Sequence, residues 1–409
     1  MNSLVHPGDA LSRRQRLVYV LVLGGLTALG PFTIDLYLPA FPLLEQDLDV
    51  STAAIQVTLS ATMLGFAFGQ LLVGPWSDKV GRRLPIVLAT AVHILASLGA
   101  ALAPDFTWLA IFRLMQGFGA AAGVVVAMAV VRDLFGGYPL VRMLSRLALV
   151  HGLAPILAPV IGSQLLQIAD WRGLFVFLAI YGGVVIVATS LFVRETLPRE
   201  RRAEAGHTTV RQRYRSLFTD RIFVGVAIVG GMNFAGLFAY LSASPFLFQE
   251  VYSFDPQQYG LLFGINSIGV VAGVQLSSRL QKSVGPQWVI AFATTMQLVA
   301  AVTIVTLDHA DAGLIGLLVP LWFFIFSCGL IFPAVQGLAL VNHGDEAGTA
   351  ASVIGAATFG TAGILSPIVG LISTSDAVPM GLVMAFSVAV GIAALWLVVQ
   401  PRTVPALSS

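Results

Sequence analysis

One carboxylate and one arginine lie inside long apolar runs of this sequence. Asp35 stands in "TIDLYLPAFP", near the end of the first run, whereas the other acidic residues fall between such runs or at their ends. Arg113 lies inside a later run. An ionisable residue within a membrane span is costly and usually faces a cavity or a partner, so both residues indicate proton chemistry. We expect Asp35 to load and release a proton while Arg113 controls its charge.

Both residues also allow a structural interpretation. Asp35 would be solvated if its span ended before Pro39 and Pro42, and Arg113 would be a hydrogen-bond donor that joins two spans. At about 1.5 Å per residue, both residues lie about 10 Å from the same membrane face. The sequence therefore predicts that Arg113 is the partner of Asp35.

The composition places the chain in a lipid bilayer. Of 409 residues, 57% are hydrophobic and only 10% are charged. A soluble domain of this length could not bury so much apolar surface while exposing so little charge. The net charge of +2 gives no reason to expect a nucleic-acid partner. Cys328 is the single cysteine and lies in an apolar run, so we expect no disulfide framework and no metal site.

Twelve apolar segments are long enough to cross the membrane, since a helical span needs about 20 residues. They predict an all-α membrane protein with spans near residues 17–42, 53–77, 85–103, 107–130, 140–168, 172–193, 221–248, 258–280, 288–307, 313–341, 347–373 and 378–400. We expect an N-terminal six-helix bundle over 1–193, a basic linker over 194–220 and a C-terminal six-helix bundle over 221–409. The first run is too long for a signal peptide, so we expect an uncleaved span.

Basic residues gather on one side of the predicted spans. Arginines precede the first span, follow the second and fourth, and fill the 194–220 segment. By the positive-inside tendency this side is the cytoplasm, and both termini are expected there. The loops of the other side carry acids such as Asp49, Asp105 and Asp255.

The two halves of the chain are similar in sequence. "ILAPVIG" at 156–162 returns as "ILSPIVG" at 364–370, and "VGRRLPIVLAT" at 80–90 returns as "VGPQWVIAFAT" at 284–294. "YLPAFP" at 37–42 aligns with "YLSASP" at 240–245. We therefore expect a duplicated six-span unit with a substrate cavity between the copies.

Several stretches resemble one transporter family. "GPWSDKVGRR" at 74–83 has the form of the loop signature of the major facilitator superfamily, carried here by Gly74, Asp78, Gly81, Arg82 and Arg83. "RLMQGFGAAAG" at 113–123 looks like the Arg-x-x-Gln-Gly-x-Gly pattern of its proton-coupled members. The first-span stretch "IDLYLPAFP" is similar to the Bcr/CflA branch of drug:proton antiporters, which includes bicyclomycin and chloramphenicol exporters.

The fifth span looks like the antiporter motif of drug exporters. Gly152, Pro155, Pro159 and Gly162 match it in "HGLAPILAPVIGS", while Ala158 and Ser163 stand where glycines are usual. Prolines between glycines suit a helix that bends during transport, although a static packing kink would have the same sequence.

Other polar and aromatic residues are candidates for the substrate site. In the alignment of the two halves, Phe238 is the counterpart of Asp35. We therefore expect proton chemistry in the first half and substrate surface mainly in the second. Each of the polar candidates could equally join helices. His93 and His151 could carry protons, but neither has an acid nearby in sequence, and we expect packing roles. The candidate substrate-binding residues are Asp35, Phe32, Gln116, Asn233, Tyr240 and Asn266.

The resemblance implies proton-coupled drug efflux by rocking of two bundles, with the 74–83 loop as a cytoplasmic latch. We expect a monomer in the bacterial cytoplasmic membrane that takes small amphipathic drugs and protons. No phosphate-binding loop or nucleophile–base pair is evident, so we expect no enzyme activity and no cofactor besides the proton gradient. An importer of a small nutrient and a non-transporting receptor or scaffold remain the alternatives.

Overall fold

The computed structural model describes residues 7–198, 210–340, 343, 347–372 and 376–404. Within these residues, 12 helical segments are long and apolar enough to cross a membrane, as the sequence predicts. The first half contains α1 (Arg13–Asp35), α2 (Phe41–Leu48), α3 (Thr52–Val80), α4 (Arg83–Ala101), α5 (Phe106–Leu134), α6 (Gly137–Leu165) and α7 (Trp171–Phe192). The second half contains α10 (Arg221–Phe246), α11 (Pro256–Val284), α12 (Pro286–His309), α13 (Gly313–Leu340), α14 (Ala347–Leu365), α15 (Ile368–Ile372) and α16 (Val378–Ala394).

Part of the predicted linker is helical. Helix α9 (Val210–Thr219) leads into α10, while residues 199–209 lie outside the described part of the chain. The division into bundles at residues 194 and 220 stays a prediction.

Acids between the spans begin several of the helices. The carboxylates of Asp105, Asp170, Asp220 and Asp255 each accept a backbone N–H of the helix that follows. These bonds satisfy donors that the first turn of a helix leaves free. The short polar loops therefore also fix where the spans start.

Glycines bring the central helices of each half into backbone contact. A Cβ atom on Gly65 of α3 would lie 2.0 Å from the carbonyl oxygen of Leu114 in α5. A Cβ atom on Gly273 of α11 would lie 2.2 Å from the carbonyl oxygen of Phe326 in α13. Small residues permit this close approach of membrane helices. The same device thus serves both copies of the repeat.

The repeat is also visible in one backbone angle. Gly81 has φ +105 and Gly285, its counterpart in "VGPQ", has φ +86. Residues other than glycine rarely adopt this region. Both glycines follow the end of a long helix and turn the chain into the next one.

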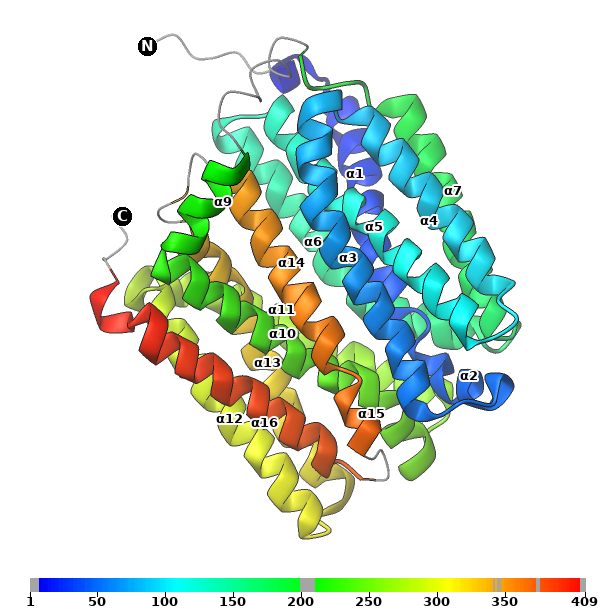
Figure 1. The fold of residues 1–409 in the computed structure, drawn as a ribbon. Coiled ribbons are helices and arrows are strands. Elements are labelled where there is room, and N and C mark those ends of the chain that lie inside the picture. Colours follow the sequence, from blue (N-terminus) through cyan, green and yellow to red (C-terminus); the bar gives the residue numbers. More distant parts are fainter. Residues whose placement is uncertain (1–6, 199–209, 341–342, 344–346, 373–375, 405–409) are drawn as a thin grey trace.

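The halves meet along two pairs of helices. Helix α3 lies against α14, and α6 lies against α11 (Figure 1). We call the face where α1 begins and α16 ends the terminus face, and the face that carries α2 and α15 the opposite face. Most other close contacts between the halves involve α2, α15 and the short helix η2 (Leu38–Ala40), so the halves are joined most closely at the opposite face.

A buried glutamine joins the halves at the opposite face. The Gln56 amide of α3 donates to the carbonyl oxygen of Ser242 at 3.1 Å and accepts from the backbone N–H of Gly370 at 2.9 Å. One turn further along α3, the hydroxyls of Ser60 and Ser366 are 3.0 Å apart. We call these contacts the Gln56 clasp. The Gly370 N–H is available because Gly370 lies in the first turn of α15 (Ile368–Ile372), where a helix leaves its backbone donors free.

Substituting Gln56 by Leu is expected to open the opposite face. The change leaves two backbone groups without their partner, which disfavours the closed arrangement. Spin labels at the exposed residues Leu102 and Ile315, with Cys328 replaced by Ala, would report the distance between halves. A second, longer population is expected in the variant. Thr52→Val is the control, because among the described residues the Thr52 hydroxyl donates to Glu45 of its own half alone. An unchanged distance distribution in Gln56→Leu would contradict the role of the Gln56 clasp.

Candidate functional site

Asp35 is the last residue of α1 and is 4% exposed. The helix stops here because Pro39 and Pro42, which lack a backbone N–H, lie in the first turns of η2 and α2. The predicted span 17–42 is therefore interrupted near the opposite face. The burial of Asp35 argues against its interpretation as a solvated residue.

The Asp35 carboxylate lies near tyrosine hydroxyls of both halves of the chain. Among the described residues, it accepts no hydrogen bond and forms no ion pair. The hydroxyl groups that interact with it electrostatically are those of Tyr37, Tyr240 and Tyr259. Because Tyr240 and Tyr259 belong to α10 and α11, the carboxylate lies at the interface between the halves.

Arg113 is fully buried in α5 and contacts an aromatic ring. Its Cζ atom lies 3.9 Å from the centroid of the Tyr37 ring, and its Nη1 donates to Gln116 Oε1 at 2.8 Å. A planar guanidinium stacks readily on an aromatic face. The structure therefore does not show the predicted ion pair with Asp35, and Tyr37 is the residue that contacts Arg113 and interacts with Asp35.

A hydrogen-bond chain extends from Arg113 to α4. The Gln116 amide donates to the Ser97 hydroxyl at 2.7 Å, and the Ser97 hydroxyl donates to the carbonyl oxygen of His93 at 2.7 Å. The His93 ring in turn lies 2.8 Å from the Thr33 hydroxyl of α1. Gln116 thus acts as a link between helices, one of the two roles that the sequence allows.

The polar candidates of the second half form two separate groups. Asn266 donates to the Tyr240 hydroxyl at 3.0 Å, and Tyr259 lies 3.0 Å from the Ser244 hydroxyl. Asn233 instead accepts from Gln297 of α12 at 2.8 Å, inside its own half. Tyr240 and Asn266 are therefore together near Asp35, and Asn233 belongs to a different group.

Phe32 packs inside the first half. Its ring lies 5.4 Å from the Tyr181 ring and 6.5 Å from the Phe177 ring of α7. The rings that stack across the interface are Phe66 of α3 and Phe359 of α14, with centroids 4.9 Å apart. Phe32 precedes Asp35 by three residues, and this spacing does not determine the helix that its ring meets.

Two further rings extend the stacked pair into the second half. Phe234 of α10 packs edge-on against Phe359 at 5.1 Å and against Phe332 of α13 at 5.7 Å. Phe234, Phe332 and Phe359 are each half-buried. We call Phe66, Phe234, Phe332 and Phe359 the interface aromatics.

The 74–83 loop is tied to its own half. Arg82 forms ion pairs with Asp78 and with Asp133 at the end of α5, and its backbone N–H donates to Glu195. Burial alone would lower the pKa of Arg82, but the interactions with Asp133 and Asp78 outweigh it and raise the pKa, so the guanidinium stays charged. Asp78 is half-exposed and pairs with Arg82. Asp78 is thus paired within the first half, and the role of the loop as a latch that stabilises the outward-open state stays a prediction.

The prolines of the fifth span do not break the helix. Helix α6 continues through Pro155 and Pro159, whereas its counterpart ends at Leu365, just before Pro367, and resumes as α15. The sequence favoured a bend in the first half, but the break lies in the second. Gly162 has a clear packing role: its Cβ would lie 1.9 Å from the carbonyl oxygen of Leu36, the residue after Asp35.

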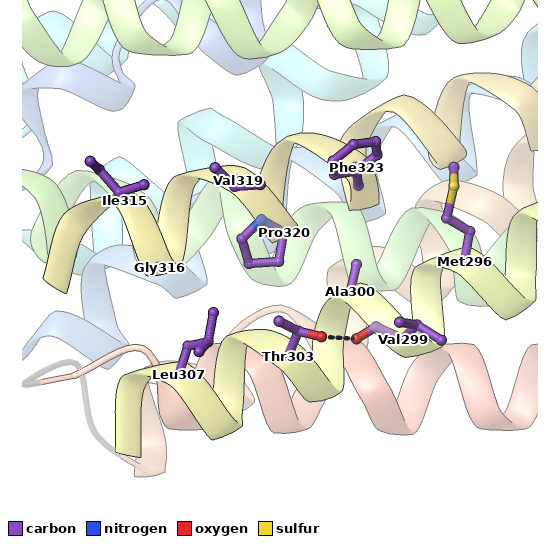
Figure 2. Close-up of a pocket in the computed structure, with 10 residues that line it drawn as sticks. All are labelled: Met296, Val299, Ala300, Thr303, Leu307, Ile315, Gly316, Val319, Pro320 and Phe323. Atoms are coloured by element: carbon purple, nitrogen blue, oxygen red, sulfur yellow. Dashed lines mark hydrogen bonds between the residues drawn. The ribbon is translucent and has the colours of Figure 1, made fainter. Parts of the chain in front are cut away.

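A groove of about 400 Å³ lies away from this site, between α12 and α13 (Figure 2). Its only hydroxyl group, on Thr303, donates to the carbonyl oxygen of Val299 within the helix. Exposed apolar side chains border it, as suits a surface in contact with hydrocarbon. The groove is lined by Met296, Val299, Ala300, Thr303, Leu307, Ile315, Gly316, Val319, Pro320 and Phe323.

Sequence reasoning missed three residues that complete the site. Tyr37 contacts Arg113, Tyr259 of the second half interacts electrostatically with Asp35, and Thr33 connects α1 to His93. "YLPAFP" and its counterpart draw attention to Tyr37, but no sequence signal indicates which ring meets the guanidinium. Among the described residues, no three His, Cys, Asp or Glu side chains gather as a metal site would require.

Comparison with known proteins places the chain in a family. The model of the Major Facilitator Superfamily matches residues 23–367. The chain belongs to this superfamily. It is 35% identical to the uncharacterized MFS-type transporter YdgK of Bacillus subtilis, over 92% of this chain and 94% of the relative. It is 29% identical to a bicyclomycin resistance protein homolog of Haemophilus influenzae, over 94% of this chain and 96% of the relative.

Solved structures agree on the fold. A D-xylose–proton symporter structure matches with a TM-score of 0.74 at 18% identity, covering 97% of this chain and 99% of that one. At this identity the match supports the architecture and says nothing about the substrate. The superfamily consists of secondary transporters, so the chain is a multi-pass membrane transporter and not an enzyme.

Proposed function

We propose that this transporter exports amphipathic antibiotics in exchange for protons. The observation that carries the proposal is Asp35, a buried carboxylate at the interface between the halves that has no hydrogen-bond donor among the described residues. Relatives that are named for bicyclomycin and multidrug resistance support drugs as the substrates. We place the chain in the Bcr/CflA branch of drug:proton antiporters on the same grounds.

Burial of Asp35 provides a means of coupling. An ionised carboxylate without a donor is costly to enclose, so closure of the halves around Asp35 favours its protonated form. When the halves separate, water can take up the proton. Asp35 is the proton-coupling group, and Arg113 acts on it through Tyr37.

The interface aromatics are suited to an amphipathic drug. Phe66 and Phe359 come from different halves, so their stacking changes when the halves move. Aromatic faces bind flat apolar groups without demanding one hydrogen-bond pattern. Tyr240 and Asn266 supply polar contacts close to Asp35, and we include Asn233, Gln116 and Phe32 as supporting residues of the site.

The remaining assignments follow from the charge pattern. We place the terminus face in the cytoplasm of a bacterial cell, with the chain acting as a monomer in the cytoplasmic membrane. In this orientation the Gln56 clasp closes the outer face. The 74–83 loop would form its latch only after the outer face opens.

The proposal is tested with inside-out vesicles whose lumen is made acidic. Vesicles that contain the transporter are expected to accumulate bicyclomycin or chloramphenicol, and a protonophore is expected to stop the accumulation. Empty vesicles are the control. Accumulation by energised right-side-out vesicles instead would show an importer, and no proton-dependent movement in either orientation with a wide antibiotic panel would contradict transport of such drugs.

A further inference from the structure

His93 of α4 is buried inside the first half, at the end of the hydrogen-bond chain that begins at Arg113. Its side chain is 0% exposed, and Gly119 of α5 and Gly182 of α7 leave room for it. A Cβ atom on Gly119 would lie 2.8 Å from His93 Cβ, and one on Gly182 would lie 3.4 Å from Nδ1. The ring therefore sits in a tight space between three helices.

The hydrogen bonds of Thr33 determine where the ring proton lies. The Thr33 hydroxyl has one proton, which it donates to the carbonyl oxygen of Leu29 at 2.7 Å. It must therefore accept from His93 Nε2, 2.8 Å away. Nδ1 has no partner among the described residues, so a second ring proton would be a buried donor without an acceptor.

The contacts of His93 lead back to both sides of Asp35. Thr33, two residues before Asp35, accepts the His93 bond. Tyr37, two residues after Asp35, contacts the Arg113 guanidinium with its ring. Arg113 is in turn linked through Gln116 and Ser97 to the backbone of His93. The segment with Asp35 is therefore held at both ends by one network from α4 and α5.

The second half contains a counterpart of His93 that cannot carry a proton. The alignment of 80–90 with 284–294 places Gln297 opposite His93. Gln297 donates its side-chain N–H to Asn233 of α10 at 2.8 Å, as His93 donates to Thr33 of α1. In both halves the third span thus supplies a neutral donor to the first span of that half.

We propose that His93 is a positioning residue for proton coupling, a neutral Nε2–H donor that holds α1 so that Asp35 stays at the interface between the halves. It does not carry the transported proton. The proposal rests on the proposed function, because it takes Asp35 as the coupling group.

The first test compares two substitutions of His93. His93→Gln keeps an N–H donor, as Gln297 shows in the second half, and is expected to retain drug-induced proton release with an unchanged pH profile. His93→Leu removes the donor and is expected to reduce this release about tenfold, the effect of losing one buried hydrogen bond. Thr33→Val, which removes the acceptor and leaves the histidine intact, is expected to match His93→Leu, while Thr33→Ser restores release. Equal loss in His93→Gln and His93→Leu would identify the imidazole as a proton carrier, and no loss in His93→Leu would exclude the positioning role.

The second test does not depend on transport. ¹⁵N NMR of the protein with labelled histidines is expected to show one neutral ring, protonated at Nε2, from pH 5 to pH 8. The signal is assigned by its absence in His93→Gln. Protonation of this ring between pH 5 and pH 8 would overturn the proposal for His93, whether or not the wild type releases protons. Absence of drug-induced proton release in the wild type would instead contradict the proposed function.

Discussion

Substituting Asp35 by Asn is expected to abolish drug-induced proton release and proton-driven export. The carboxylate has no hydrogen-bond or ion-pair partner among the described residues, so a neutral group of the same size removes no contact. We therefore expect the fold and the packing of the interface aromatics to be unchanged. The variant loses only the group that binds and releases the proton. Proton release from the purified protein in detergent, followed with a pH indicator after addition of the antibiotic that the vesicles accumulate, measures the effect.

Asp47→Asn is the matched control for this substitution. Asp47 is also an acid of the first half near the opposite face, but it is half-exposed and binds Arg172 at 2.8 Å. Its replacement is expected to leave proton release unchanged. Antibiotic binding to Asp35→Asn, measured by equilibrium dialysis, separates a loss of coupling from a loss of binding. If Asp35→Asn releases protons as the wild type does, Asp35 has a structural role and another group is the coupling site.

The number and order of the spans could be predicted because hydropathy is a local property. Spans of about 20 apolar residues are long compared with the uncertainty in their ends. The turn at Gly81 could also be predicted, since the same Val-Gly pair returns at Gly285 in the second half. Both glycines have a positive φ in the structure. The interruption after Asp35 was harder to predict, because Pro39 is tolerated at the start of a helix as well as in a kink.

The partner of Arg113 could not be predicted from depth alone. The rise per residue gives the height of Asp35 and Arg113 in the membrane, but not the direction of a side chain about the helix axis. Asp35 lies near Tyr240 of the second half, whereas Arg113 meets the ring of Tyr37 just beyond the end of α1. Likewise, Asn233 and Tyr240 are seven residues apart on one helix and still bond to different helices, α12 and α11.

Gly162→Val is expected to cause the largest loss among substitutions in the fifth span. A Cβ atom at this position would lie 1.9 Å from the carbonyl oxygen of Leu36, which is backbone and cannot rotate away. The end of α1 must then move, and Asp35 moves with it. Overpacking of this kind costs about 1–3 kcal/mol of stability. We expect Gly162→Val to lower the melting temperature and to reduce export by more than the loss of folded protein accounts for. Gly152→Val in the same helix is the matched control, because the nearest atom to its Cβ would be Val271 Cγ2 at 3.9 Å. Export and thermal unfolding are measured for both variants; equal losses would show that these glycines serve helix bending in general and that the contact with Leu36 is unimportant.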